Sequence, residues 1–314
     1  MATKPTVTAV SAMEVPTGSR LQSSSCLTIV LSDYWALTKP EVNTLIAVAT
    51  FAGFYLGYPG ALGSFPLWLS VNTLVGTLLV ASGTATLNQY LERHFDAQMR
   101  RTARRPLAAE RLSPQSALWF GILLSVTGGM YLAFVVNVLA SVLTALTLVS
   151  YLFVYTPLKR KTPLCTLAGA FPGAMPPLIG WAAATGTLSL GAWILYAILF
   201  LWQFPHFMAI AWIYREDYVR AGYVVLPRGE RKAQFVTWGS VLPILFLFPV
   251  SIAPTLLGRA GLPYATAALI LTSAFLYCGV ELALHKSNTV AKRLLFASII
   301  YVPLIFLLMM INKP

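Results

Sequence analysis

Apolar residues along this chain occur in long runs separated by shorter polar segments. Each run is close to the roughly 20 residues that a helix needs to cross the hydrocarbon core of a bilayer. Several runs contain Gly or Pro, which membrane helices tolerate where neighbouring helices cover the freed backbone groups. The pattern predicts an all-α fold, a polytopic membrane helical bundle of about nine transmembrane helices, at 42–58, 66–88, 114–132, 135–155, 165–184, 190–213, 235–256, 263–284 and 293–311.

The composition supports a membrane protein. Of the 314 residues, 57% are hydrophobic and 10% are charged, whereas about a quarter are charged in an ordinary soluble domain. So few charges could not cover the surface of a soluble domain of this size. The three cysteines, Cys26, Cys165 and Cys278, show no metal-binding or redox spacing and are interpreted as small apolar residues within helices.

The first residues differ from the rest of the chain. They are rich in Ser and Thr and lack both the basic and apolar regions of a signal peptide and the Arg-rich pattern of a transit peptide. We predict that residues 1–33 are a disordered cytoplasmic tail and that 34–314 form one nine-helix domain. The missing transit pattern favours the inner (plasma) membrane of a bacterium over a mitochondrial inner membrane.

The positive charges predict the orientation. The N-terminal segment and the loops after the second, fourth, sixth and eighth runs hold 20 of the 22 Lys and Arg residues, and the opposite face holds only Arg259 and Lys313. Because cytoplasmic loops carry an excess of Lys and Arg, the N-terminus and these loops are predicted to be cytoplasmic. The loops after the second and sixth runs are long and polar, so chemistry is expected at that end.

A ladder of polar residues leaves the second run. On a continuing helix, residues four apart share one face, and these are Asn88, Glu92, Asp96 and Arg100. Amide and carboxylate oxygens suit Mg²⁺, which binds one or two carboxylates together with phosphate oxygens and water, and nearby arginines offer donors to phosphate. The segment indicates a magnesium diphosphate site. The alternative is an amphipathic helix whose charges form salt bridges and contact lipid headgroups.

A second polar cluster follows the sixth run. Asp217 lies eleven residues after His206, which is about three helical turns, so both side chains are expected to face the same way. Carboxylates from two halves of the chain could then hold a metal and a phosphate between them. His206 is either a hydrogen-bonded packing residue or a functional one, because ionisable groups within membrane spans are often functional.

Six strings between about residues 35 and 230 resemble the UbiA superfamily of membrane prenyltransferases, and more specifically its haem O synthase branch. They lie at 38–40, 88–106, 155–162, 174–181, 202–207 and 217–227. Relatives in quinone pathways usually carry an Asp-xxx-Asp pair in both polar motifs, whereas here the first is Glu92-xxx-Asp96 and the second ends in Ala221. One departure from the family pattern is Cys165, where Asn is common.

The resemblance implies a bundle around a central cavity and the Mg²⁺-assisted transfer of a farnesyl group from farnesyl diphosphate to the 2-vinyl group of haem B, with addition of water. It implies metal or diphosphate ligation by Asn88, Glu92, Asp96 and Asp217. His206 would accept a proton from water or position the haem. Substrate contacts are expected from Lys39, Arg100, Arg104, Arg105, Tyr155, Lys159, Arg160, Tyr214 and Tyr218.

The same resemblance implies the lipid bilayer as the surroundings, haem A synthase as a possible partner that takes the product onward, and no nucleic acid. Another UbiA-type aromatic prenyltransferase of quinone biosynthesis remains the alternative enzyme. A transporter or channel is disfavoured, because such proteins place polar residues near the bilayer midplane. Here the middle positions of the runs are mostly apolar.

Overall fold

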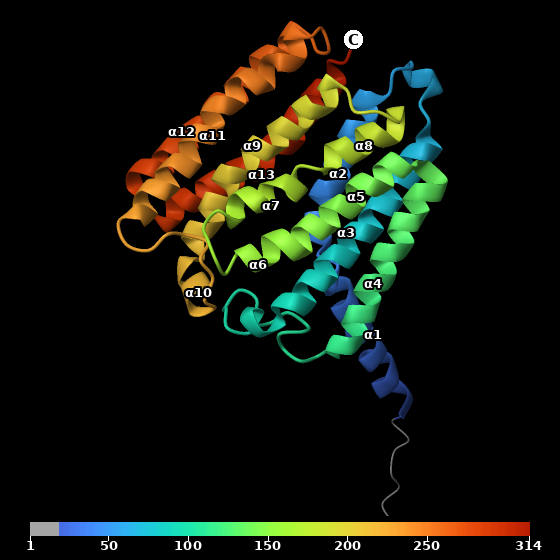
Figure 1. Ribbon diagram of the computed structural model, residues 1–314, viewed down its shortest axis with the longest axis vertical. Helices are drawn as coiled ribbons and strands as arrows, with labels where there is room; N and C mark the ends of the chain where they lie inside the picture. Colours follow the sequence, from blue (N-terminus) through green and yellow to red (C-terminus); the bar gives the residue numbers. More distant parts are fainter. Residues whose placement is uncertain (1–18) are drawn as a thin grey trace, which may run out of the picture.

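The computed structural model describes residues 19–314, and these fold as a bundle of helices (Figure 1). The first half of the bundle contains α1 (Ser19–Leu37), α2 (Pro40–Gly57), α3 (Leu67–Asp96), α4 (Pro114–Tyr131), α5 (Val138–Val149) and α6 (Thr156–Leu158). The second half contains α7 (Cys165–Gly173), α8 (Pro176–Thr185), α9 (Leu190–Ile213), α10 (Arg215–Arg220), α11 (Arg231–Leu256), α12 (Leu262–His285) and α13 (Asn288–Ile311). Two π-helical segments, Leu132–Val136 and Ser150–Tyr155, continue α4 and α5, and Leu62–Ser64 is a short 3₁₀ helix.

Seven helices within the described residues are long and apolar enough to cross a membrane. They correspond to α3, α4, α5, α9, α11, α12 and α13, with α4 and α5 extended by their π-helical segments. Of the other two predicted spans, 42–58 falls on α2, and 165–184 is divided between α7 and α8. Pro176 and Pro177 cause that division, since neither has an N–H to continue the helix. The multi-pass all-α fold is confirmed, while the count of nine stays a prediction.

The predicted N-terminal tail needs a correction. Residues 1–18 lie outside the described residues, but 19–33 form most of α1 instead of a disordered segment. The end of this helix is tied to the loop after α3, because the Arg111 guanidinium donates three hydrogen bonds of 2.8–3.1 Å to the Asp33 carboxylate. The same pairing raises the pKa of Arg111. Asp33 is 7% exposed, so the ion pair fixes a buried charge.

Glycines allow the central helices to approach closely. A Cβ atom at Gly53 in α2 would lie 2.1 Å from the carbonyl oxygen of Pro177, and one at Gly180 in α8 would lie 1.9 Å from that of Thr50. In α3, a Cβ atom at Gly83 would lie 2.7 Å from the backbone oxygen of Gly121 in α4. Small residues commonly allow such contacts between membrane helices. They hold α3, which carries the polar ladder, close to its neighbours.

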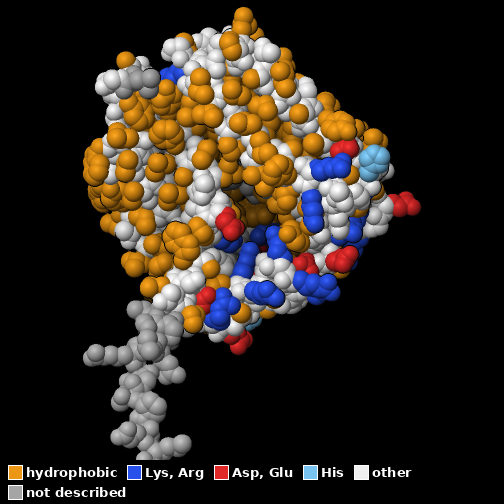
Figure 2. Space-filling model, turned by 180° about the vertical axis from the view of Figure 1, so that it is seen from behind, with side chains coloured by type: hydrophobic (Ala, Val, Ile, Leu, Met, Phe, Trp, Pro, Cys, Tyr) orange, Lys and Arg blue, Asp and Glu red, His pale blue; other side chains and the backbone are white. Residues whose placement is uncertain are grey.

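The loops are sorted between the two ends of the bundle. The loops after α3, α6 and α10 lie at the same end as α1, and the C-terminus lies at the other end (Figure 1). The face opposite to that view is hollowed near its centre, with hydrophobic side chains around the hollow and Lys and Arg side chains gathered along its lower side (Figure 2). The basic segments therefore share one end, as the charge pattern predicts.

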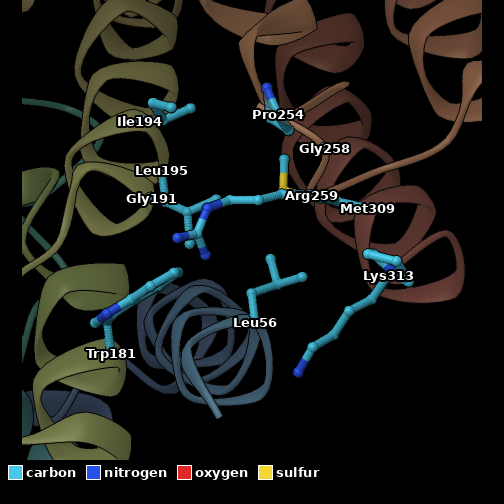
Figure 3. Close-up of a pocket in the computed structure, with 11 residues that line it drawn as sticks. Leu56, Trp181, Gly191, Ile194, Leu195, Pro254, Gly258, Arg259, Met309 and Lys313 are labelled. Atoms are coloured by element: carbon cyan, nitrogen blue, oxygen red, sulfur yellow. The ribbon is translucent and has the colours of Figure 1, made fainter. Parts of the chain in front are cut away.

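The two cations predicted on the opposite face meet at one pocket. This pocket of about 120 Å³ is lined by both Arg259 and Lys313 (Figure 3). The Lys313 ammonium donates hydrogen bonds of 2.8 and 2.6 Å to the carbonyl oxygens of Tyr55 and Tyr58. A cation stabilises a helix C-terminus, so Lys313 caps α2. The Arg259 guanidinium lies 5.5 Å from the Trp181 ring, and both cations therefore contribute to packing.

The close contact between α2 and α8 generates a test of stability. Gly180→Ala is expected to destabilise the protein by about 3 kcal/mol, at the upper part of the range for overpacked sites, because the new methyl group meets backbone atoms. Gly129→Ala in α4 is the control, since a Cβ atom there meets nothing within 4 Å. Thermal unfolding in detergent, followed by circular dichroism, should show a lower midpoint for Gly180→Ala alone. Equal midpoints would contradict the packing described.

Candidate active site

The last turns of α3 carry three buried polar side chains on one face. Asn88, Glu92 and Asp96 are 1%, 5% and 2% exposed. The helix ends at Asp96, and Arg100 is exposed in the turn that follows. The predicted ladder is therefore right for three positions and wrong for Arg100. Two carboxylates buried at the end of an apolar bundle require nearby cations.

Glu92 is the centre of a network that joins three parts of the chain. The Lys159 ammonium donates to both carboxylate oxygens of Glu92, at 2.9 and 3.0 Å. The Asn88 amide donates to Glu92 at 3.0 Å, and the Lys39 ammonium donates to the Asn88 carbonyl oxygen at 3.1 Å. Lys159 also lies 4.5 Å from the centre of the Tyr155 ring, a favourable position for a cation. The network connects the start of α2, the end of α3 and the residue that follows α6.

Lys39 is unusual in both backbone and charge. Its φ of 51° and ψ of 64° place it in the left-handed region at the junction of α1 and α2, and strain of this kind is often found at functional sites. Burial, together with the positive charges of Arg105 and Lys159, lowers the pKa of Lys39 to about 7. Its hydrogen-bond partner is an amide and not a carboxylate, so an arriving anion would find a cation without a counter-ion.

Asp96 is paired through the loop that follows it. Arg105 donates to the Asp96 carboxylate at 2.7 Å, and the Thr102 hydroxyl donates to the Asp96 backbone oxygen at 2.8 Å. These contacts fold residues 97–105 back over the end of α3. Arg105 is partly exposed, with 28% of its side-chain surface accessible, and it can therefore contact a ligand as well as Asp96.

The second polar cluster meets the first through this loop. Asp217 accepts a hydrogen bond of 3.2 Å from the backbone N–H of Arg101 and one of 3.1 Å from Arg220. The Arg101 guanidinium lies 4.5 Å from the ring centre of Tyr214 and 5.7 Å from that of Tyr218. Two segments more than a hundred residues apart in sequence thus form one surface at the basic end of the bundle.

The predicted alignment of His206 with Asp217 is wrong. Helix α9 ends at Ile213, and Asp217 belongs to the separate short helix α10. His206 instead shares a 2.8 Å hydrogen bond with the Ser298 hydroxyl of α13, and its ring stacks on Trp202 at 4.9 Å. The structure does not bring His206 to the carboxylates, and a catalytic role for it stays a prediction.

Three of the predicted arginines lie away from the buried network. Arg100 and Arg104 are exposed, and neither forms an ion pair with any side chain that the structure describes. The Arg160 guanidinium lies over the Phe95 ring at 4.4 Å. These three cations lie around the buried network and do not belong to it.

Tyr223 is a residue that the sequence analysis missed. Gly222, with a φ of 71°, reverses the chain after α10, and the Tyr223 N–H then donates to the Tyr218 oxygen at 2.8 Å. The side chain is 7% exposed, and its hydroxyl is a buried group without a hydrogen-bond partner in the described structure. Burial and the adjacent Glu92 raise the pKa of Tyr223. The Ala-Gly pair indicated a turn, but nothing in the sequence showed that the chain returns to Glu92.

The chemistry of these donors fits Mg²⁺ only together with an anionic ligand. Across residues 19–314, no group of three or more His, Cys, Asp or Glu side chains is arranged to hold a metal. Glu92, Asp96 and Asp217 each face a cation instead. Mg²⁺ commonly needs only one or two carboxylates when substrate phosphates and water complete its ligands. The buried hydroxyl of Tyr223 places one further oxygen beside Glu92.

A multi-pass helical bundle with carboxylates and cations buried at one end is typical of membrane-embedded enzymes. The chain belongs to the UbiA prenyltransferase family, whose model matches residues 44–300. This membership confirms the resemblance found in the sequence, and it makes the protein a membrane prenyltransferase.

Named relatives and solved structures agree with that membership. The protoheme IX farnesyltransferase of Solibacter usitatus is 47% identical over 290 residues, covering 90% of this chain and 99% of the relative. That of Koribacter versatilis is 41% identical over 293 residues, covering 90% and 94%. A digeranylgeranylglyceryl phosphate synthase structure has a TM-score of 0.73 at 15% identity, covering 90% of this chain and 98% of that one.

A UbiA homolog from Archaeoglobus fulgidus, solved with GPP and Mg²⁺ bound, has a TM-score of 0.57 at 17% identity. It covers 88% of this chain and 99% of that one. At such low identities the two structural similarities support the fold alone.

The buried ion pair can be tested by a double-mutant cycle. Lys159→Met leaves the Glu92 carboxylate buried without its main partner and is expected to cost about 3 kcal/mol of stability. Adding Glu92→Gln removes the unpaired charge and should recover much of that loss. The free energies would come from unfolding of the purified protein in detergent. Losses that simply add in the double variant would show that the two side chains do not interact.

Proposed function

We propose that this enzyme transfers the farnesyl group of farnesyl diphosphate to the 2-vinyl group of haem B, with addition of water, giving haem O and diphosphate. The relatives named protoheme IX farnesyltransferase support the substrate pair. The structural observation that carries the proposal is the buried network of Lys39, Asn88, Glu92 and Lys159, with Asp96 and Arg105 beside it. Its cations suit a diphosphate, and its oxygens suit the accompanying metal.

The first step breaks the allylic C–O bond of farnesyl diphosphate. Both electrons of that bond leave with the diphosphate oxygen, so negative charge grows on the leaving group. Lys39, Lys159 and Arg105 would neutralise it, and fixed charges of this kind are most effective where water is excluded. Mg²⁺ held by Asn88, Glu92, Asp96 or Asp217 together with diphosphate oxygens would supply further positive charge.

The second step forms a carbon–carbon bond. The vinyl π electrons of haem B attack the allylic carbon, which leaves a cation on the carbon next to the porphyrin ring. A water oxygen bonds to that carbon and loses a proton to a carboxylate of the site or to His206. Hydrophobic surroundings would keep water from the farnesyl cation until the acceptor has reacted.

Orientation and location follow from the charge pattern. The basic end of the bundle, which carries the network, would face the cytoplasm under the positive-inside rule. The bacterial relatives support the plasma membrane as its location. Haem A synthase would be the enzyme that receives the product. The second candidate is prenyl transfer to an aromatic acid of quinone biosynthesis, which the Glu92 and Ala221 positions disfavour.

The direct test supplies purified protein in lipid vesicles with haem B, farnesyl diphosphate and Mg²⁺. Haem O should form on chromatography, stop forming when EDTA removes the metal and return when Mg²⁺ is added in excess. No haem O, together with prenylation of 4-hydroxybenzoate, would move the protein to the quinone branch.

A paired substitution tests the site itself. Asp96→Asn should lower kcat/KM by about 100-fold, the usual effect of losing one charge-stabilising group. Asp33→Asn is the matched control, because Asp33 is also a buried carboxylate paired with an arginine but lies in α1. It should retain near-normal turnover if it still folds, which circular dichroism can check. Normal activity in Asp96→Asn would remove Asp96 from the mechanism.

A further inference from the structure

A second cavity lies beside the loop that follows α10. It has a volume of about 200 Å³, and its lining includes Arg215, Tyr218, Tyr223, Arg228 and Lys232. None of the side chains that line it is acidic. Three cations around one small cavity without a carboxylate create a positive potential, and such a potential favours an anionic ligand.

Two of the three cations are not used by the fold. Arg215 donates hydrogen bonds of 2.7 Å to the Trp212 oxygen and 2.6 Å to Asn288. Within the described part of the chain, neither Arg228 nor Lys232 has a side-chain hydrogen bond or ion pair. Lys232 lies 5.4 Å from the centre of the Trp212 ring. Glu216 lies near Arg215 and Lys232 and forms an ion pair of 3.8 Å with Arg215, whereas no carboxylate of the described residues forms an ion pair with Lys232.

The start of α11 adds to the same cavity. Gly229, with a φ of 67°, ends the loop, and Glu230 precedes the first helical residue without forming a side-chain cap. The N–H groups of Lys232 and Ala233 already donate to the backbone oxygens of Gly229 and Glu230, at 3.2 Å each. The start of α11 therefore contributes to the cavity through the Lys232 side chain, which belongs to the first turn of this helix.

The cavity is directly adjacent to the active site. Tyr223 lines the cavity and also lies beside Glu92. The next residue, Val224, donates its N–H to the Lys159 backbone oxygen at 2.7 Å. A flat ligand that reacts near the diphosphate could therefore extend past Tyr223 into this cavity.

We propose that this cavity binds the two propionate carboxylates of haem B. Arg228 and Lys232 form ion pairs with the carboxylates, and Arg215 forms part of the cavity wall. The inference rests on the proposed function. Haem B carries its propionates on two pyrrole rings and its vinyl groups on the other two. The carboxylates and the reacting vinyl group must therefore bind at separate places in the protein. Two free cations match two carboxylates, which favours haem over the single phosphate of a lipid headgroup.

Binding can be measured without turnover. Purified protein in a neutral detergent is titrated with haem B and with its dimethyl ester, whose carboxylates carry no charge, and binding is followed by quenching of tryptophan fluorescence. The double variant Arg228→Gln, Lys232→Met should bind haem B roughly tenfold more weakly, as expected for two partly exposed charge pairs, with the ester unchanged. Lys292→Met, an exposed cation of α13 at the same end, is the control and should change neither.

Turnover gives an independent measurement. In the double variant the KM for haem B should rise by a similar factor, while kcat and the KM for farnesyl diphosphate stay unchanged. Equal weakening of haem B and its ester would show that the two residues only shape the cavity. If the affinity for neither ligand changes, the propionates bind elsewhere in the protein. An effect that appears only when anionic phospholipid is added would assign the cavity to lipid headgroups.

The two proposals fail differently. If the wild-type protein forms no haem O, the proposed reaction is wrong. The difference between haem B and its ester in the binding titration still decides whether the cavity recognises carboxylates. If haem O forms and the double variant behaves as wild type, only the cavity assignment is wrong.

Discussion

The cost of placing carboxylates inside an apolar bundle determines most of what surrounds the site. Glu92 and Asp96 are almost fully buried at the end of α3, and charges there are stable only beside opposite charges. Lys159 therefore lies against Glu92, and Arg105 lies against Asp96. Because Lys159 follows α6 and Arg105 follows α3, these two ion pairs fix the positions of the polar segments at the mouth of the bundle. The glycine contacts between helices then hold α3 where these pairings require it.

Local periodicity predicted only part of this arrangement. The spacing of Asn88, Glu92 and Asp96 was sufficient to place them on one face, because four residues make about one helical turn. The same rule failed for Arg100, because α3 ends at Asp96. It also failed for Asp217, because the helix is interrupted at Tyr214 between α9 and α10. Periodicity applies only while the helix continues, and helix ends are the hardest feature to locate in a sequence.

The contacts between residues far apart in the chain could not be predicted from the sequence, for a different reason. Lys159 and Glu92 are 67 residues apart, and Arg101 and Asp217 are 116 residues apart, and a single sequence contains no signal for such distances. The family motifs indicated which residues matter, but not which residue pairs with which. Tyr223 was missed because its position depends on the reversal at Gly222. The charge count, by contrast, predicted the basic end of the bundle well, since it depends only on the order of the loops.

The complete pairing of the carboxylates has a consequence for how a ligand would enter. Glu92, Asp96 and Asp217 already have cationic partners, so the charge of each carboxylate is balanced before any substrate arrives. Binding of a metal–diphosphate complex would exchange these partners: the carboxylates would hold the metal, and the lysines and arginines would contact the phosphate oxygens. Such an exchange moves little net charge into a region of low dielectric constant. Departure of the product would reverse it, with the protein's own ion pairs re-forming as competitors that displace the diphosphate.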